Sequence, residues 1–284
     1  MKHLPCQIKM IPSTIEALTK LLCHCPCIIL LLFVYTVLIP RVVSYDHSWA
    51  ITEILYLEEA AFKTGPQLNW QDLKNGLNYE KFEGKKTPRI TRPLSSYFQI
   101  LDAKFRAWLW RYILPHPSLS LTWLFSLLLA PLFLYLSLRN LGVDCNIAIG
   151  MSIFYLLTPT NLSHITELFR PAKPLADFVI IFCLYWASSL EKNFLQQNKP
   201  LPWGKYLFFW FTVAFSFYWD EYALLIFPAI LVVFPKVLTH RKGYLLLWLL
   251  LPFITAAFYF CVIPCLTWLS GFEYPHLSHY FCYL

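Results

Sequence analysis

The chain has 284 residues, of which 58% are hydrophobic and 18% aromatic, while only 14% are charged. Together with a mean hydropathy of +0.52, this composition excludes an ordinary soluble domain, in which about a quarter of the residues are charged. The net charge is +7, but the cations flank apolar runs, so we interpret them as reporting membrane orientation and expect no nucleic acid as a partner.

Seven apolar runs have about the length that a membrane-spanning helix needs, roughly 20 residues, or slightly less. They cover residues 21–38, 119–138, 143–157, 174–190, 206–219, 222–234 and 244–269. We therefore predict an all-α polytopic membrane protein with about seven transmembrane helices in one domain. Because only Asp220 and Glu221 separate the fifth run from the sixth, 206–234 could instead be one long bent helix, which would reverse the topology of all that follows.

The first run resembles the apolar core of a signal peptide, because lysines precede it. It has no small-x-small cleavage site before Arg41, so a retained first helix is the better interpretation. A Cys-His-Cys-Pro-Cys sequence at 23–27 falls in or at the start of this helix, with no second cluster to complete a metal site. We expect its cysteines to be buried small side chains or palmitoylated. The predicted parts are a cytoplasmic N-terminus at 1–20, a transmembrane domain at 21–269 and a short tail at 270–284.

Cations gather on one side of the predicted helices. The short outer connection before the fourth run carries only Arg170 and Lys173, whereas the inner segments carry most of the others. This bias follows the positive-inside rule. It predicts an integral, multi-pass protein of a bacterial inner membrane or the endoplasmic reticulum, with a cytoplasmic N-terminus. The inner cations are Lys2, Lys9, Lys20, Arg139, Lys192, Lys199, Lys205, Lys236, Arg241 and Lys242.

A long outer loop, 42–118, is the one large polar segment, and we expect surface helices in it. In 48–62 acidic residues are interleaved with apolar ones at helical spacing, which is typical of a helix lying along the membrane surface. A second helix is predicted over 93–113, with proline at its first turn, where the missing N–H does no harm. Its Trp108, Trp110 and Tyr112 suit a membrane interface.

Two charged residues of this loop are candidates for chemistry. Asp46, just beyond the first helix, can act as a general base on a hydroxyl or amide acceptor, or hold a divalent cation, the one cofactor that we consider. It can equally cap the surface helix that follows. Arg92 opens the second surface helix, where a cation opposes the helix macrodipole unless an anion such as phosphate neutralises it. A lipid headgroup would explain Arg92 equally well.

Other candidate charges lie near the later helices. Glu167 and Arg170 precede the fourth run, and Asp177 follows inside it at a spacing of two helical turns from Arg170. An ion pair within the helix is the plain alternative for these two. Asp220 and Glu221 are adjacent acids that would be costly at membrane depth, unless they merely form a polar turn.

The order of these features resembles the GT-C superfamily of membrane glycosyltransferases, in particular its protein O-mannosyltransferase-like branch. Members are similar in having an acid after the first helix, an Arg-Pro-Leu element opening a loop helix, and further charges at the later helix junctions. The matching residues here are Asp46; Arg92-Pro93-Leu94 with Leu101-Asp102; Pro159, Glu167, Arg170 and Asp177; and Asp220-Glu221, followed by Leu224-Leu225-Ile226-Phe227-Pro228.

The resemblance implies transfer of a sugar from a polyprenyl-phosphate donor to an acceptor on the outer or lumenal face. Asp46 would be the catalytic base or a metal ligand, and Arg92 and Arg170 would contact the donor phosphate. Glu167 and Asp177 would shape the acceptor side or hold the arginines, and the acidic pair 220–221 would belong to the substrate site. The expected partners are the lipid bilayer and the lipid-linked sugar.

Two alternatives stay open at this stage. A transporter or lipid-handling protein could use Asp177 and the 220–221 pair to line a substrate or proton path. A non-catalytic or truncated GT-C-like protein would explain why Asp46 is followed by His47 where many relatives have a second acid, and why the chain has fewer helices than such enzymes usually have.

Overall fold

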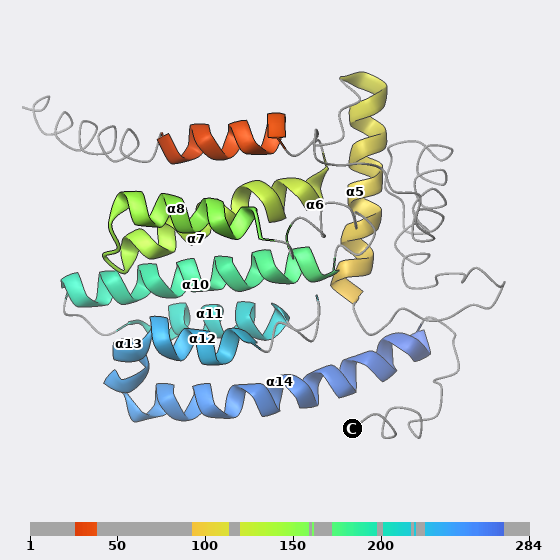
Figure 1. Cartoon of the computed structure of the whole chain (residues 1–284). Coiled ribbons are helices and arrows are strands. Elements are labelled where there is room, and N and C mark those ends of the chain that lie inside the picture. Colours follow the sequence, from red (N-terminus) through yellow and green to blue (C-terminus); the bar gives the residue numbers. More distant parts are fainter. Residues whose placement is uncertain are drawn as a thin grey trace, which may run out of the picture.

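The computed structural model describes residues 26–38, 93–113, 120–158, 161, 172–197, 201–216, 219 and 225–269. Within these ranges all regular structure is helical, and no strand occurs. Most helices lie side by side with their axes nearly parallel, while α5 crosses one end of the bundle (Figure 1). The all-α prediction is therefore confirmed for the part of the chain that is described.

The helices have the following bounds. The first covers 26–38 and ends in a π-helical turn, η1 (Val34–Leu38). The others are α5 (Pro93–Tyr112), α6 (Leu121–Trp123), η2 (Leu124–Leu129), α7 (Ala130–Asn140), α8 (Cys145–Leu156), α10 (Ala172–Gln197), α11 (Trp203–Ser216), α12 (Ile226–Val233), α13 (Pro235–His240) and α14 (Lys242–Leu269). α6, η2 and α7 follow one another without a break and form one helix, Leu121–Asn140.

Two of these helices are long and apolar enough to cross a membrane, Leu121–Asn140 and Pro174–Gln197. They correspond to the second and fourth predicted runs. The prediction of seven spans is not confirmed, because the other apolar stretches, Pro26–Thr36, Cys145–Leu156 and the part Lys242–Phe258 of α14, are shorter. α12 has eight residues, which at 1.5 Å per residue amount to about 12 Å, well short of the roughly 30 Å of a hydrocarbon core.

The region 206–234 forms two helices and not one. α11 ends at Ser216 and α12 begins at Ile226, with Trp219 in a turn between them. The two run in opposite directions beside α10 (Figure 1). Of the two interpretations left open by the sequence, the structure therefore supports a reversal of the chain between these runs.

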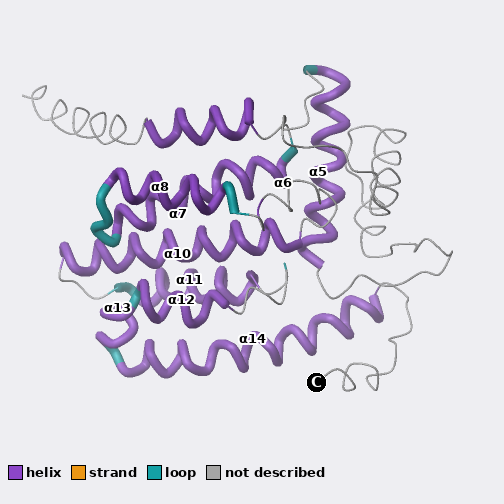
Figure 2. The backbone as a smooth tube through the Cα atoms, viewed as in Figure 1, coloured by secondary structure: helices purple, strands orange, loops and turns teal. Residues whose placement is uncertain are grey.

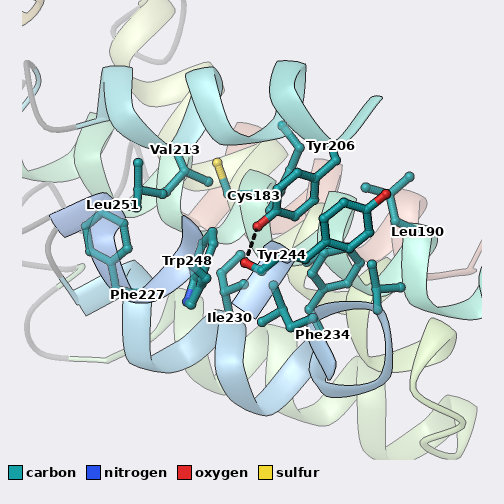
Figure 3. Packing of buried hydrophobic residues seen from close by; sticks show 14 of the residues in the cluster. Cys183, Leu190, Tyr206, Val213, Phe227, Ile230, Phe234, Tyr244, Trp248 and Leu251 are labelled. Carbon is teal, nitrogen blue, oxygen red and sulfur yellow. Dashed lines mark hydrogen bonds between the residues drawn. The ribbon is translucent and has the colours of Figure 1, made fainter. Parts of the chain in front are cut away.

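The larger of two apolar clusters joins α10 to α11–α14 and is dominated by aromatic rings (Figure 3). The rings of Tyr206 and Tyr244 stack with centroids 4.3 Å apart. The Tyr206 hydroxyl donates to the backbone oxygen of Tyr244 at 2.8 Å, and the Tyr244 hydroxyl donates to that of Leu201 at 2.6 Å. Both phenols thereby bury their rings while satisfying their polar atoms.

We expect Tyr206→Phe to lower the free energy of unfolding by about 1 kcal/mol, because the Tyr244 carbonyl loses a buried donor while the stacked rings remain. Denaturant titration in detergent would measure the change. Tyr112→Phe alters an exposed phenol and serves as the matched control. Equal effects of the two variants would contradict this account of the Tyr206 hydroxyl.

The second cluster packs the first helix against the segment 123–156. Cys27, Leu31, Trp123, Tyr135 and Ala148 are among its fully buried members. Cys27 is thus a buried small side chain, as predicted for the 23–27 cysteines, whereas Cys23 and Cys25 lie outside the described residues.

Candidate functional site

A chain of aromatic contacts lies where α5 crosses the end of the bundle. The ring centroid of Phe98 on α5 lies 5.5 Å from that of Trp219 and 5.7 Å from that of Phe125 on η2. The Phe125 ring in turn lies 4.9 Å from that of Phe178 on α10. We call these four residues the aromatic junction. Each pair meets edge to face, an arrangement that aromatic quadrupoles favour.

The aromatic junction anchors three segments that carry predicted site residues. α5 begins directly after Arg92, and Phe98 lies in its second turn. Trp219 directly precedes the 220–221 pair, and Phe178 directly follows Asp177. Segments about 40 to 120 residues apart in the sequence therefore meet at one end of the molecule, which hydropathy alone did not predict.

Of the predicted site residues, only Asp177 lies within the described part of the chain. It is half-buried in the second turn of α10, beside the aromatic junction. The remaining ones, whose mutual placement stays a prediction, are Asp46, Arg92, Glu167, Arg170, Asp220 and Glu221. Among the described residues no group of three His, Cys, Asp or Glu side chains could hold a metal ion, and the cation proposed for Asp46 is not tested by that finding.

α5 matches the predicted surface helix 93–113 to within a residue. Asp102, Lys104, Ala107 and Leu109 are buried, while Trp108, Tyr112 and Ile113 are exposed. Exposed aromatic residues on a helix that lies across the bundle end are what a membrane interface would accommodate.

The buried carboxylate of Asp102 fastens α5 to the start of the helix Leu121–Asn140. It is 3% exposed and accepts hydrogen bonds from the Ser120 hydroxyl (2.8 Å), the Leu121 amide (2.6 Å) and the Thr122 hydroxyl (2.8 Å). An ionised carboxylate is an acceptor only, so this group of donors suits it, and the amides that it binds belong to a helix N-terminus, which favours a negative charge. Asp102 is thus the residue that positions the helix following Arg92.

Sequence reasoning noted Asp102 only as part of a family-like element and gave it no role. The local sequence sign of a partner for Asp102 was the polar pattern Ser-Leu-Thr at 120–122. Such a pattern is typical of a helix start, whose first backbone N–H groups need acceptors. That the acceptor comes from α5, 18 residues earlier, depends on the tertiary contact.

Comparison with known proteins assigns no function to this chain. No family model matches the chain, and neither a curated protein nor a solved structure proved similar to it. The resemblance to GT-C glycosyltransferases therefore rests on the order of the quoted motifs.

Proposed function

We propose that this protein is a multi-pass membrane glycosyltransferase that moves a sugar from a polyprenyl-phosphate donor to an acceptor on the outer or lumenal face of its membrane. The observation that carries the proposal is the aromatic junction. It gathers the segments next to Arg92, Asp177 and the 220–221 pair at one end of the bundle, as a site assembled from those motifs requires.

Membrane embedding is supported by what the helices expose. Large apolar side chains point outward along the outer helices, among them Phe154 on α8, Phe208 on α11, Val232 on α12 and Phe253 on α14. Val232 is 80% and Phe253 74% exposed. In water such a surface would be a liability for aggregation, whereas hydrocarbon solvates it at no cost.

The orientation of α5 supports a site at the membrane interface. α5 lies across the bundle end instead of along the bundle axis (Figure 2), and its exposed Trp108 and Tyr112 would sit at the depth of the headgroups. A lipid-linked phosphate lies at the same depth, so a helix that begins directly after Arg92 would bring the guanidinium within reach of it.

The proposed reaction is a displacement at the anomeric carbon. The acceptor oxygen forms a bond to that carbon as the bond from carbon to phosphate oxygen breaks, and the lipid phosphate leaves with the electron pair. Asp46 takes the acceptor proton, while Arg92 and Arg170 neutralise the charge that develops on the leaving phosphate. Glu167, Asp177 and the 220–221 pair orient the acceptor or hold the arginines.

The test measures the transfer of sugar from a radiolabelled polyprenyl-phosphate sugar. The membranes that contain the protein also supply the acceptor. We expect Asp46→Asn to lower the passage of label out of the lipid fraction by a factor of at least about 100, the usual contribution of a general base.

Asp144→Asn is the matched control, because Asp144 is an exposed carboxylate at the opposite end of the bundle, and it should leave transfer unchanged. Full transfer by Asp46→Asn protein, made at the normal level, would refute the proposed mechanism.

A further inference from the structure

The end of the bundle opposite α5 is strongly basic. The connections from α7 to α8 and from α13 to α14 lie there, as do the C-terminal end of α10 and the N-terminal end of α11 (Figure 2). Described cations at or near the ends of these helices are Arg139, Lys192, Lys205, Lys236, Arg241 and Lys242. All of them except the half-buried Arg139 are exposed, so their charge faces the surroundings.

The described carboxylates at this end are already engaged. Asp144 accepts from the Asn146 amide at 2.8 Å and caps α8. Glu191 is 6% exposed, and its two oxygens accept from the backbone amides of Lys236 and Val237 at 2.9 and 3.0 Å. These acids satisfy backbone donors, and the exposed cations keep a surplus of positive charge.

Three of the cations lie close in sequence to the exposed Trp203 or to Tyr244, at the starts of α11 and α14. The ring centroids of Trp203 and Tyr244 lie 4.5 Å apart, and the guanidinium carbon of Arg241 lies 5.8 Å from the Tyr244 centroid. Lys205 follows Trp203 by two residues, and Lys242 lies between Arg241 and Tyr244. We call Trp203, Lys205, Arg241 and Lys242 the Trp203 patch; the Tyr244 ring lies buried beneath it. Neither α11 nor α14 has an acidic residue in its first turn.

The Trp203 patch continues directly into an apolar surface. One turn further along the same two helices, Leu207 and Phe208 on α11 and Leu246 on α14 are exposed. An occupant that matches both surfaces carries a negative head beside a hydrocarbon tail. An acidic protein would match only the charged part.

We propose that the Trp203 patch binds the phosphate headgroup of an anionic phospholipid in the adjoining leaflet. An exposed tryptophan such as Trp203 favours the headgroup level, and each cation near an anionic leaflet strengthens binding about fivefold. The inference rests on the membrane placement proposed above and is independent of sugar transfer.

The experiment uses the full chain in mixed micelles that contain equal amounts of phosphatidylglycerol and phosphatidylcholine, with retained lipids counted by native mass spectrometry. We expect retained phosphatidylglycerol to exceed phosphatidylcholine by about 100-fold, because three cations contribute about fivefold each. The triple variant Lys205→Gln/Arg241→Gln/Lys242→Gln should bring the ratio close to one, and Arg241→Gln alone should reduce it about fivefold.

Arg111→Gln is the matched control, because Arg111 is also an exposed arginine beside a tyrosine ring, 5.6 Å from the Tyr112 centroid, but at the other end of the bundle. It should leave the ratio unchanged. A ratio near one for the unaltered protein would overturn the inference, as would equal losses from Arg111→Gln and Arg241→Gln, or displacement of the lipid by polyglutamate.

Flotation of the protein with vesicles of either lipid separates this inference from the membrane proposal. Protein that floats with both kinds of vesicle yet retains no excess of phosphatidylglycerol contradicts the lipid site alone. Protein that floats with neither contradicts the membrane placement itself.

Discussion

Asp102→Ala is expected to lower the free energy of unfolding by about 3 kcal/mol and to loosen α5 from the bundle. The substitution leaves the Ser120 and Thr122 hydroxyls and the Leu121 amide without their buried acceptor, and each unsatisfied buried donor costs about 1 to 3 kcal/mol. Denaturant titration in detergent gives the stability. Faster proteolysis within α5 under native conditions would report the loosening.

Two variants calibrate this result. Asp102→Asn keeps one carbonyl acceptor and should lie between the alanine variant and the unaltered protein. Asp144→Ala removes an exposed cap that accepts one hydrogen bond, for which about 1 kcal/mol is expected. If Asp102→Ala costs no more than Asp144→Ala, Asp102 does not fasten α5 in the way described.

Glu191→Ala is expected to lower the free energy of unfolding by about 2 to 3 kcal/mol, because Glu191 on α10 is the acceptor for two amides at the start of α13. Hydrogen bonds to a charged acceptor contribute about 1.5 to 3 kcal/mol. Denaturant titration measures the loss, and we expect unfolding to begin at α13 and the start of α14, so amide hydrogen exchange there should rise first.

Lys192→Ala provides the comparison at the neighbouring position. The Lys192 ammonium is exposed and donates to the Asn140 side chain at 3.4 Å, a contact that should contribute under about 0.5 kcal/mol. Glu191→Gln retains one acceptor oxygen and should cost less than the alanine variant. A loss in Lys192→Ala as large as that in Glu191→Ala would assign the effect to the general charge of this end and not to the capping of α13.

Hydropathy predicted the elements better than their lengths. The run 119–138 matches Leu121–Asn140 closely, and the predicted surface helix matches α5. The run 222–234 predicted a span, whereas α12 begins at Ile226 and ends at Val233, where Phe234 and Pro235 interrupt the helix. The predicted end of the run at Phe234 agrees with the end of α12 to within a residue, and Pro235 marks where a new helix starts.

The candidate site was predictable in its residue types but not in its assembly. The sequence picked out Arg92, Asp177 and the 220–221 pair by the cost of charges near a membrane. It gave no sign that Phe98, Phe125, Phe178 and Trp219 would bring their segments together, because aromatic residues are common throughout this chain and only contact selects these four.

Local composition and helical periodicity are enough to predict that the described part of the chain is helical, where most of its apolar helices lie and near which helix ends its cations gather. They do not predict that the acids Asp102 and Glu191 cap distant helices or that α5 crosses the bundle end beside Asp177, which depend on tertiary contacts. A buried carboxylate must find donors, and which donors it finds depends on how helices far apart in the sequence pack.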